Sequence, residues 1–121
     1  MLVLAIALAG AVGAPTRYFV DAVVIDRSEG GLPLATFVIN VSGSFVLGVL
    51  TGLALYHAFP STPKTILGTG FCGAYTTFST FAYETVRLSE ERAFSAALQN
   101  TVATLVVPAL AAATGLALAS L

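Results

Sequence analysis

Two long stretches of this chain contain no charged residue, and they set the frame for the fold. The first runs from Leu32 to Pro63 and the second from Ala93 to Leu121. A helix rises about 1.5 Å per residue, so either stretch is long enough to cross the roughly 30 Å of hydrocarbon in a bilayer. We predict a membrane-spanning helix in each, the earlier one closed by the prolines of Pro60-Ser61-Thr62-Pro63.

An apolar run before these stretches predicts a first span from about Leu2 to Ile25, ending in the polar turn 26–31. Arg17 and Asp21 are four residues apart, so they are expected on one helical face, where they could pair. A cleaved signal peptide is the alternative for residues 1–14. No Lys or Arg precedes Arg17, so the basic region of such a peptide is missing, and we interpret the segment as a retained helix.

The remaining segment, Thr65 to Arg87, has an unusual density of glycine and hydroxyl residues. Gly68, Gly70 and Gly73 precede the run Thr-Thr-Phe-Ser-Thr-Phe at residues 76–81. We predict a third span that is broken. Unwound backbone persists in hydrocarbon only where it is buried in protein or lines a polar site, and there it can present main-chain groups to an ion. The alternative is a glycine-rich surface for close helix packing.

Composition agrees with a membrane protein, since 57% of the 121 residues are hydrophobic, 9% are charged and the mean hydropathy is +0.93. This length gives room for four spans in a single domain, residues 1–121. With five basic residues and a net charge of -1 there is no basic patch, so nucleic-acid binding is not expected. Cys72 is the one cysteine and is expected to be a small buried residue.

Asn40 lies in the middle of the second predicted span, where an unpaired amide is costly. It is a candidate site residue, with an interhelical hydrogen bond as the alternative role. Small residues follow it at intervals of four positions: Ser44, Gly48 and Gly52. This spacing predicts a face of the helix that contacts another helix.

Two further groups of residues are candidates for binding an ion. Phe78 and Phe81 flank two hydroxyl residues, and the edges of their rings carry partial positive charge that suits an anion; core or lipid packing is the alternative. Asn100 and Thr104 share a face of the last span, next to Pro108, which predicts a polar track. The alternative there is a threonine that bonds back to its own helix.

No catalytic set emerges, because the chain has one histidine, no carboxylate pair within a span and no hydroxyl with a nearby base, so we do not expect an enzyme. A proton-coupled transporter would need a titratable carboxylate deep in the membrane. The candidates, Asp21 and Glu84, both lie near predicted helix ends.

Three segments together resemble the Fluc/CrcB fluoride channel family over most of the chain. They are Gly10 to Tyr18 (GAVGAPTRY), Thr36 to Gly48 (TFVINVSGSFVLG) and Gly70 to Phe81 (GFCGAYTTFSTF). The resemblance implies an all-α membrane fold of four helices with a broken third helix, assembled as an antiparallel, dual-topology dimer. It also implies two fluoride pores and a structural Na⁺ held by backbone carbonyls where the third helices cross.

The resemblance further implies a role for particular side chains. Asn40 would be the pore amide, Phe78 and Phe81 an aromatic box, and Arg17 would lie at the vestibule. The residues assigned to the fluoride pore are Asn40, Phe78, Phe81, Ser79, Thr80, Thr104 and Arg17. The sodium ligands would be Gly73 and Thr76. In this chain Asn100 occupies a position where the family commonly has a tyrosine.

A passive fluoride channel is therefore the preferred function, and a small proton-coupled multidrug exporter of four-helix type is the alternative. Such exporters depend on a carboxylate in the first helix, and residues 2–17 contain none. The partner is a second copy of this chain or a paralogous subunit. Three arginines, 27, 87 and 92, fall on one predicted side and Lys64 on the other, which favours both termini outside. A heterodimer with an oppositely biased partner is therefore a hypothesis beside the homodimer.

Overall fold

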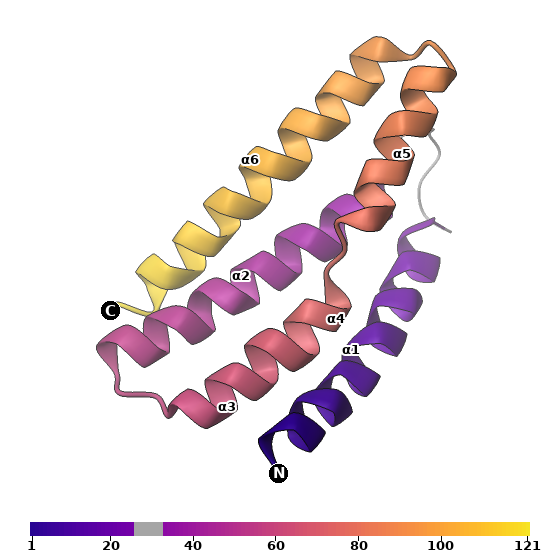
Figure 1. Ribbon diagram of the computed structural model, residues 1–121. Coiled ribbons are helices and arrows are strands. Elements are labelled where there is room, and N and C mark those ends of the chain that lie inside the picture. Colours follow the sequence, from indigo (N-terminus) through magenta and orange to yellow (C-terminus); the bar gives the residue numbers. More distant parts are fainter. Residues whose placement is uncertain (26–32) are drawn as a thin grey trace.

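The computed structural model describes residues 1–25 and 33–121, and every regular element in those ranges is helical. In these described ranges, three helices are long and apolar enough to cross a membrane: α1 (Leu2–Ile25), α2 (Leu34–Tyr56) and α6 (Phe94–Leu118). Between α2 and α6 the chain forms the shorter elements α3 (Ser61–Thr65), η1 (Ile66–Cys72), α4 (Gly73–Tyr75) and α5 (Ser79–Glu90). The predicted four-helix membrane fold with an interrupted third helix is confirmed (Figure 1).

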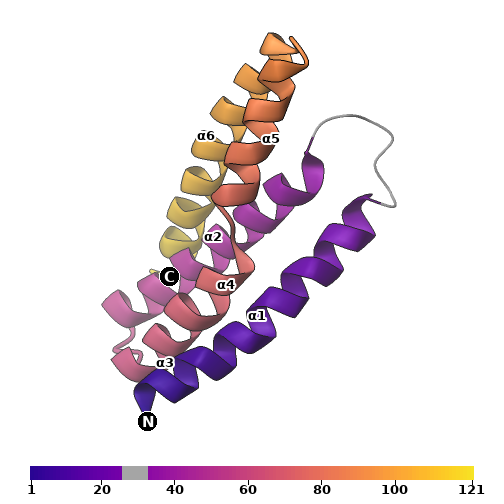
Figure 2. The same cartoon turned by 45° about the vertical axis from the view of Figure 1, so that its right-hand side comes forward.

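The helices form an elongated bundle in which α2 contacts α6 along most of its length. α1 lies against η1 and α4, whereas α5 packs against the N-terminal part of α6 (Figure 2). Both termini and the connection from α2 to α3 lie toward one end of the bundle, and the connection from α5 to α6 lies at the other (Figure 1). The chain is therefore a multi-pass membrane protein.

Close backbone contact between α2 and α6 depends on glycine. A Cβ atom at Gly48 would lie 2.1 Å from the carbonyl oxygen of Ala112, and one at Gly115 would lie 2.4 Å from that of Phe45. A Cβ atom at Gly52 would likewise lie 2.8 Å from the carbonyl oxygen of Leu116. Because lipid tails are as apolar as the side chains, such close van der Waals packing is a main source of helix association in a membrane. The contact face predicted from the spacing of these glycines is confirmed.

The glycines of the third segment do not mark the place where it unwinds. Gly68 and Gly70 lie inside η1, a π-helical stretch, and a Cβ atom at Gly70 would approach the carbonyl oxygen of Ile6 on α1 to 2.7 Å. The interruption falls later, at residues 76–78, between α4 and α5. The predicted break is therefore present, but these glycines serve close packing, the role given above as the alternative.

Two local predictions need correction. α2 ends at Tyr56, where Ala58 adopts a positive φ of 52°, and Pro63 lies in the first turn of α3, where proline is tolerated. The predicted ion pair between Arg17 and Asp21 does not form. Within residues 1–25 and 33–121, the one ion pair with a nitrogen–oxygen distance below 4.0 Å joins Arg87 to Glu91. The predicted polar turn at 26–31 lies outside the described residues.

The α2–α6 contact predicts different outcomes for two glycine-to-alanine substitutions. Gly48→Ala is expected to destabilise the protein by about 1–3 kcal/mol, because the new methyl group meets fixed backbone. Gly10→Ala on α1 is the control, since its methyl group would find its nearest neighbours at 3.6 and 3.7 Å. Thermal unfolding in detergent measures both, and equal melting temperatures would contradict the packing role of Gly48.

Candidate functional site

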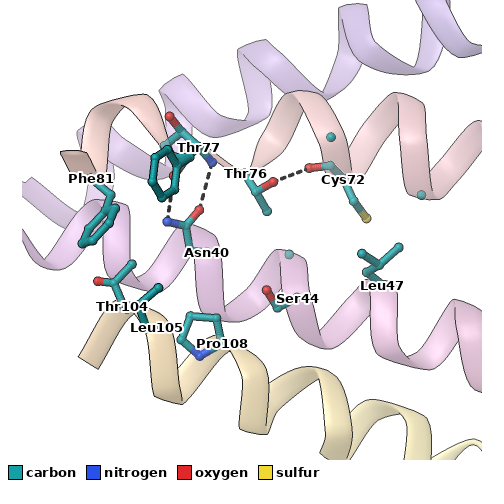
Figure 3. A pocket seen from close by; sticks show the side chains of 14 residues that line it. Asn40, Ser44, Leu47, Cys72, Thr76, Thr77, Phe81, Thr104, Leu105 and Pro108 are labelled. Carbon is teal, nitrogen blue, oxygen red and sulfur yellow. Dashed lines mark hydrogen bonds between the residues drawn. The ribbon is translucent and has the colours of Figure 1, made fainter. Parts of the chain in front are cut away.

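The interruption of the third segment is held in place by the side chain of Asn40. Thr76 has an extended conformation (φ -78°, ψ 161°), which stops the helix after Tyr75. The Asn40 Nδ2 group donates to the carbonyl oxygen of Thr77 at 2.9 Å, and the Thr77 amide donates to Asn40 Oδ1 at 2.9 Å (Figure 3). The side-chain amide thus pairs with both backbone groups of Thr77, as a neighbouring peptide group would.

The hydroxyl of Thr77 starts the next helix. Its oxygen accepts a hydrogen bond from the Thr80 amide at 3.2 Å, which is the cap that the first turn of α5 requires. The Thr80 hydroxyl lies 3.1 Å from the same oxygen. Asn40 and Thr77 therefore define the end of one helical segment and the beginning of the next.

These bonds release two backbone carbonyls from the helical pattern. In a continuous helix the Thr77 amide would bond the carbonyl of Gly73, and the Thr80 amide would bond that of Thr76. Both amides donate elsewhere, to Asn40 and to the Thr77 hydroxyl. The carbonyls of Gly73 and Thr76 are consequently available to another partner.

Tyr75 fastens the interruption to α2, a contact that the sequence did not reveal. Its hydroxyl lies 2.8 Å from Ser42 Oγ, and Ser42 donates its own proton to the carbonyl of Val38 at 2.8 Å, so the tyrosine is the donor. The Tyr75 ring stacks on Phe71 with a centroid distance of 5.7 Å. Neither Tyr75 nor Thr77 has a spacing that would single it out, because both act across the gap between two helices.

A cavity of about 300 Å³ opens beside the interruption, between η1, α2, α5 and α6. Six of the predicted site residues line it: Asn40, Gly73, Thr76, Phe78, Phe81 and Thr104. Figure 3 shows Asn40, Phe81 and Thr104 together at one end, with Ser44 and Cys72 farther along. None of the described residues that line this cavity carries a charge. Its polar groups are amides, hydroxyls and main-chain atoms.

The two phenylalanines differ in their surroundings. Their rings meet edge to face, with centroids 5.5 Å apart and an angle of 60° between the planes. Phe81 is buried, whereas 74% of Phe78 is exposed in the single chain. Phe78 therefore lines the larger cavity while most of its surface stays exposed in the single chain.

Two of the predicted pore residues lie on the other side of the interruption. Arg17 and Thr80 line a smaller cavity of about 160 Å³ between α1, α2 and the start of α5, together with Asp21. Thr77 borders both cavities. Ser79 is exposed and lines neither of them.

Further polar contacts tie α5 to its neighbours. Thr36 donates to Glu84 Oε1 at 2.7 Å, which joins this carboxylate of α5 to α2. The other oxygen, Oε2, is buried without a partner in the described part of the chain.

On α6, Asn100 and Thr104 share a face as predicted, and they are joined by a hydrogen bond of 3.5 Å.

Comparison with known proteins identifies related sequences over nearly the whole chain. The family described as "CrcB-like protein, Camphor Resistance (CrcB)" matches residues 4–116. A protein of Leifsonia xyli subsp. xyli named "Fluoride-specific ion channel FluC 1" is 49% identical over 121 residues, covering 100% of this chain and 88% of that protein. "Fluoride-specific ion channel FluC 2" of Mycolicibacterium paratuberculosis is 47% identical over 116 residues, covering 96% and 92%.

Removal of the Asn40 amide is expected to loosen the interruption. Asn40→Leu leaves the backbone groups of Thr77 unpaired, which costs about 1–3 kcal/mol for each group that water does not reach. Hydrogen exchange followed by mass spectrometry should show faster exchange in a peptide covering residues 76–80. Ser44→Ala is the control, because Ser44 lines the same cavity one turn away on α2. Unchanged exchange in Asn40→Leu would refute the clamp.

Proposed function

Because this chain belongs to the CrcB-like family, we propose that it is a channel that lets fluoride leave the cell passively and so limits fluoride toxicity in the cytoplasm. Its relatives of 49% and 47% identity are named fluoride-specific ion channels. The observation that carries the proposal is the cavity at the interruption of the third helix, whose described lining combines apolar side chains with neutral amide and hydroxyl groups. Family membership also agrees with the expectation that the chain is not an enzyme.

The chemistry of the cavity suits a small, strongly hydrated anion. A pore must replace the water around fluoride with donors strong enough to admit it and weak enough to release it. The backbone of Thr77 binds Asn40 Oδ1 and one of the two N–H groups of the Asn40 amide. The second N–H of that amide is left to donate to an ion. Ring edges of Phe78 and Phe81, the Thr104 hydroxyl and the positive end of the α5 dipole complete a neutral donor set.

Arg17 has a different role in this proposal. It lines the smaller cavity, across the interruption from Asn40 and together with Asp21, where its guanidinium offers an arriving anion a positively charged group. The Thr80 hydroxyl, at the start of α5, would meet the anion in this vestibule, and Ser79 beside it would act only where a second chain or the solvent brings the ion to its exposed face. A full cation outside the narrow region attracts fluoride without trapping it inside.

The functional unit is proposed to be an antiparallel dimer with two pores, surrounded by lipid. The exposure of Phe78 and the open side of the larger cavity support a second chain that completes the site. Each chain would supply one set of Asn40 and phenylalanine side chains, so a pair of chains forms two paths.

A structural Na⁺ fits the two released carbonyls. Gly73 and Thr76 offer neutral backbone oxygens of the kind that hold Na⁺ at unwound membrane helices. One chain supplies two such oxygens, too few for a full coordination shell, so the matching pair from the second chain is required. The ion would supply a fixed positive charge that joins the two interruptions.

The aromatic role predicts a specific loss of transport. Phe81→Ile keeps apolar bulk but removes the ring edge, so fluoride flux should fall at least tenfold while the dimer stays assembled. A fluoride electrode records efflux from liposomes, with chloride efflux measured in parallel. Phe94→Ile, at an exposed position outside the cavity, is the matched control. Full flux in Phe81→Ile would remove the phenylalanines from the proposed path.

The distribution of arginine predicts how the chain inserts. Arg87 lies in the last turn of α5 and Arg92 in the connection from α5 to α6, whereas Lys64 lies in α3, and these elements are at opposite ends of the bundle (Figure 1). This distribution favours both termini outside. Arg27, counted with these arginines above, lies outside the described residues. Proteolysis of a tag at the C-terminus in intact cells should therefore report one orientation, and a paralogous chain would supply the other. Robust fluoride flux from this chain expressed alone would instead establish a homodimer.

A further inference from the structure

Asn100 on α6 takes part in a chain of hydrogen bonds that has a fixed direction. Its Nδ2 group donates to Thr85 Oγ1 at 2.9 Å, and Thr85 donates its own proton to the carbonyl of Phe81 at 2.9 Å. Asn100 Oδ1 accepts from Thr104 Oγ1 at 3.5 Å. Each hydroxyl has a single proton, so no bond in the chain can reverse alone. The buried asparagine thus connects the turn that carries Phe81 with the residue of α6 that lines the larger cavity.

Thr104 differs from other threonines in the helices of this protein. The hydroxyls of Thr16, Thr101 and Thr114 donate to the carbonyl four residues earlier, at 2.8 to 2.9 Å. The Thr104 hydroxyl is directed to the side chain of Asn100 instead, at a distance well beyond the usual 2.7–2.8 Å for two oxygens. Its proton is therefore weakly held at a buried position that faces the cavity.

We propose that Asn100 is a positioning residue that keeps the Thr104 hydroxyl available to an anion in the cavity. In the empty cavity Oδ1 of Asn100 accepts the hydroxyl hydrogen. When an anion arrives, the hydroxyl rotates about its C–O bond and donates to the anion, while the asparagine stays bound to Thr85. No covalent bond changes. This inference rests on the proposed function, because it concerns how the same cavity binds fluoride.

The alternative acceptor for Thr104 shows why the asparagine matters. A buried hydroxyl needs a partner, and the backbone carbonyl of residue 100 lies four residues earlier in the same helix. Thr101 and Thr114 use the equivalent carbonyl. Without the amide at position 100, the Thr104 hydroxyl is expected to turn to that carbonyl, and the cavity loses a donor.

The test measures fluoride flux against fluoride concentration in liposomes that contain the assembled channel. Asn100→Leu and the smaller Asn100→Ala should raise the half-saturating concentration roughly three- to tenfold, the effect of losing one neutral hydrogen bond. Thr104→Val should raise it equally, and the double variant Asn100→Leu/Thr104→Val should raise it no further. Thr101→Val is the matched control and should match the wild type.

The outcomes separate this inference from the function on which it rests. If the wild-type channel passes no fluoride, the proposed function itself fails. If the wild type conducts, an unchanged half-saturating concentration in both Asn100 variants overturns the role of Asn100. A further rise on adding Asn100→Leu to Thr104→Val also overturns it. So does a loss of maximal flux alone, since a purely structural asparagine would reduce the amount of assembled channel without changing its affinity.

Discussion

The paired hydrogen bonds between Asn40 and Thr77 are the constraint on which the site depends. Inside a bilayer there is no water to satisfy an unwound backbone, so an interrupted helix needs a partner from elsewhere in the protein. One side-chain amide supplies both a donor and an acceptor to the same residue. The start of α5, the released carbonyls of Gly73 and Thr76, and the cavity beside them all follow from that pairing.

The fold was largely predictable because hydropathy and charge decide which segments enter a membrane. The charge-free stretches correspond to α2 and α6, and the first apolar run corresponds to α1 with its predicted bounds. The third segment was harder. Its glycines indicated where the helix would break, yet Gly70 packs against α1 and Gly68 lies close to Leu47 of α2. The position of the break is set by a contact between Asn40 and Thr77, which are far apart in sequence.

The candidate site was predictable only in part, and the interruption explains the difference. Six of the expected residues line one cavity, whereas Arg17 and Thr80 line another and Ser79 lines neither. Helical spacing predicts a common face only while the helix continues. After the interruption at residues 76–78, the direction of a side chain in α5 no longer follows from its distance in sequence to Gly73. The contacts of Tyr75 and Asn100 likewise depend on helices that spacing cannot place.

The π-helical geometry of η1 ties the length of the third segment to its function. A π-helix closes each hydrogen bond over five residues instead of four, so η1 accommodates more residues per turn than an α-helix would. Deletion of a single residue there would rotate everything after it by about 100° relative to the part that packs on α1. Asn40 would then face a different peptide group. Insertions and deletions in this segment are consequently as disruptive as substitutions in the site itself, although no residue changes identity.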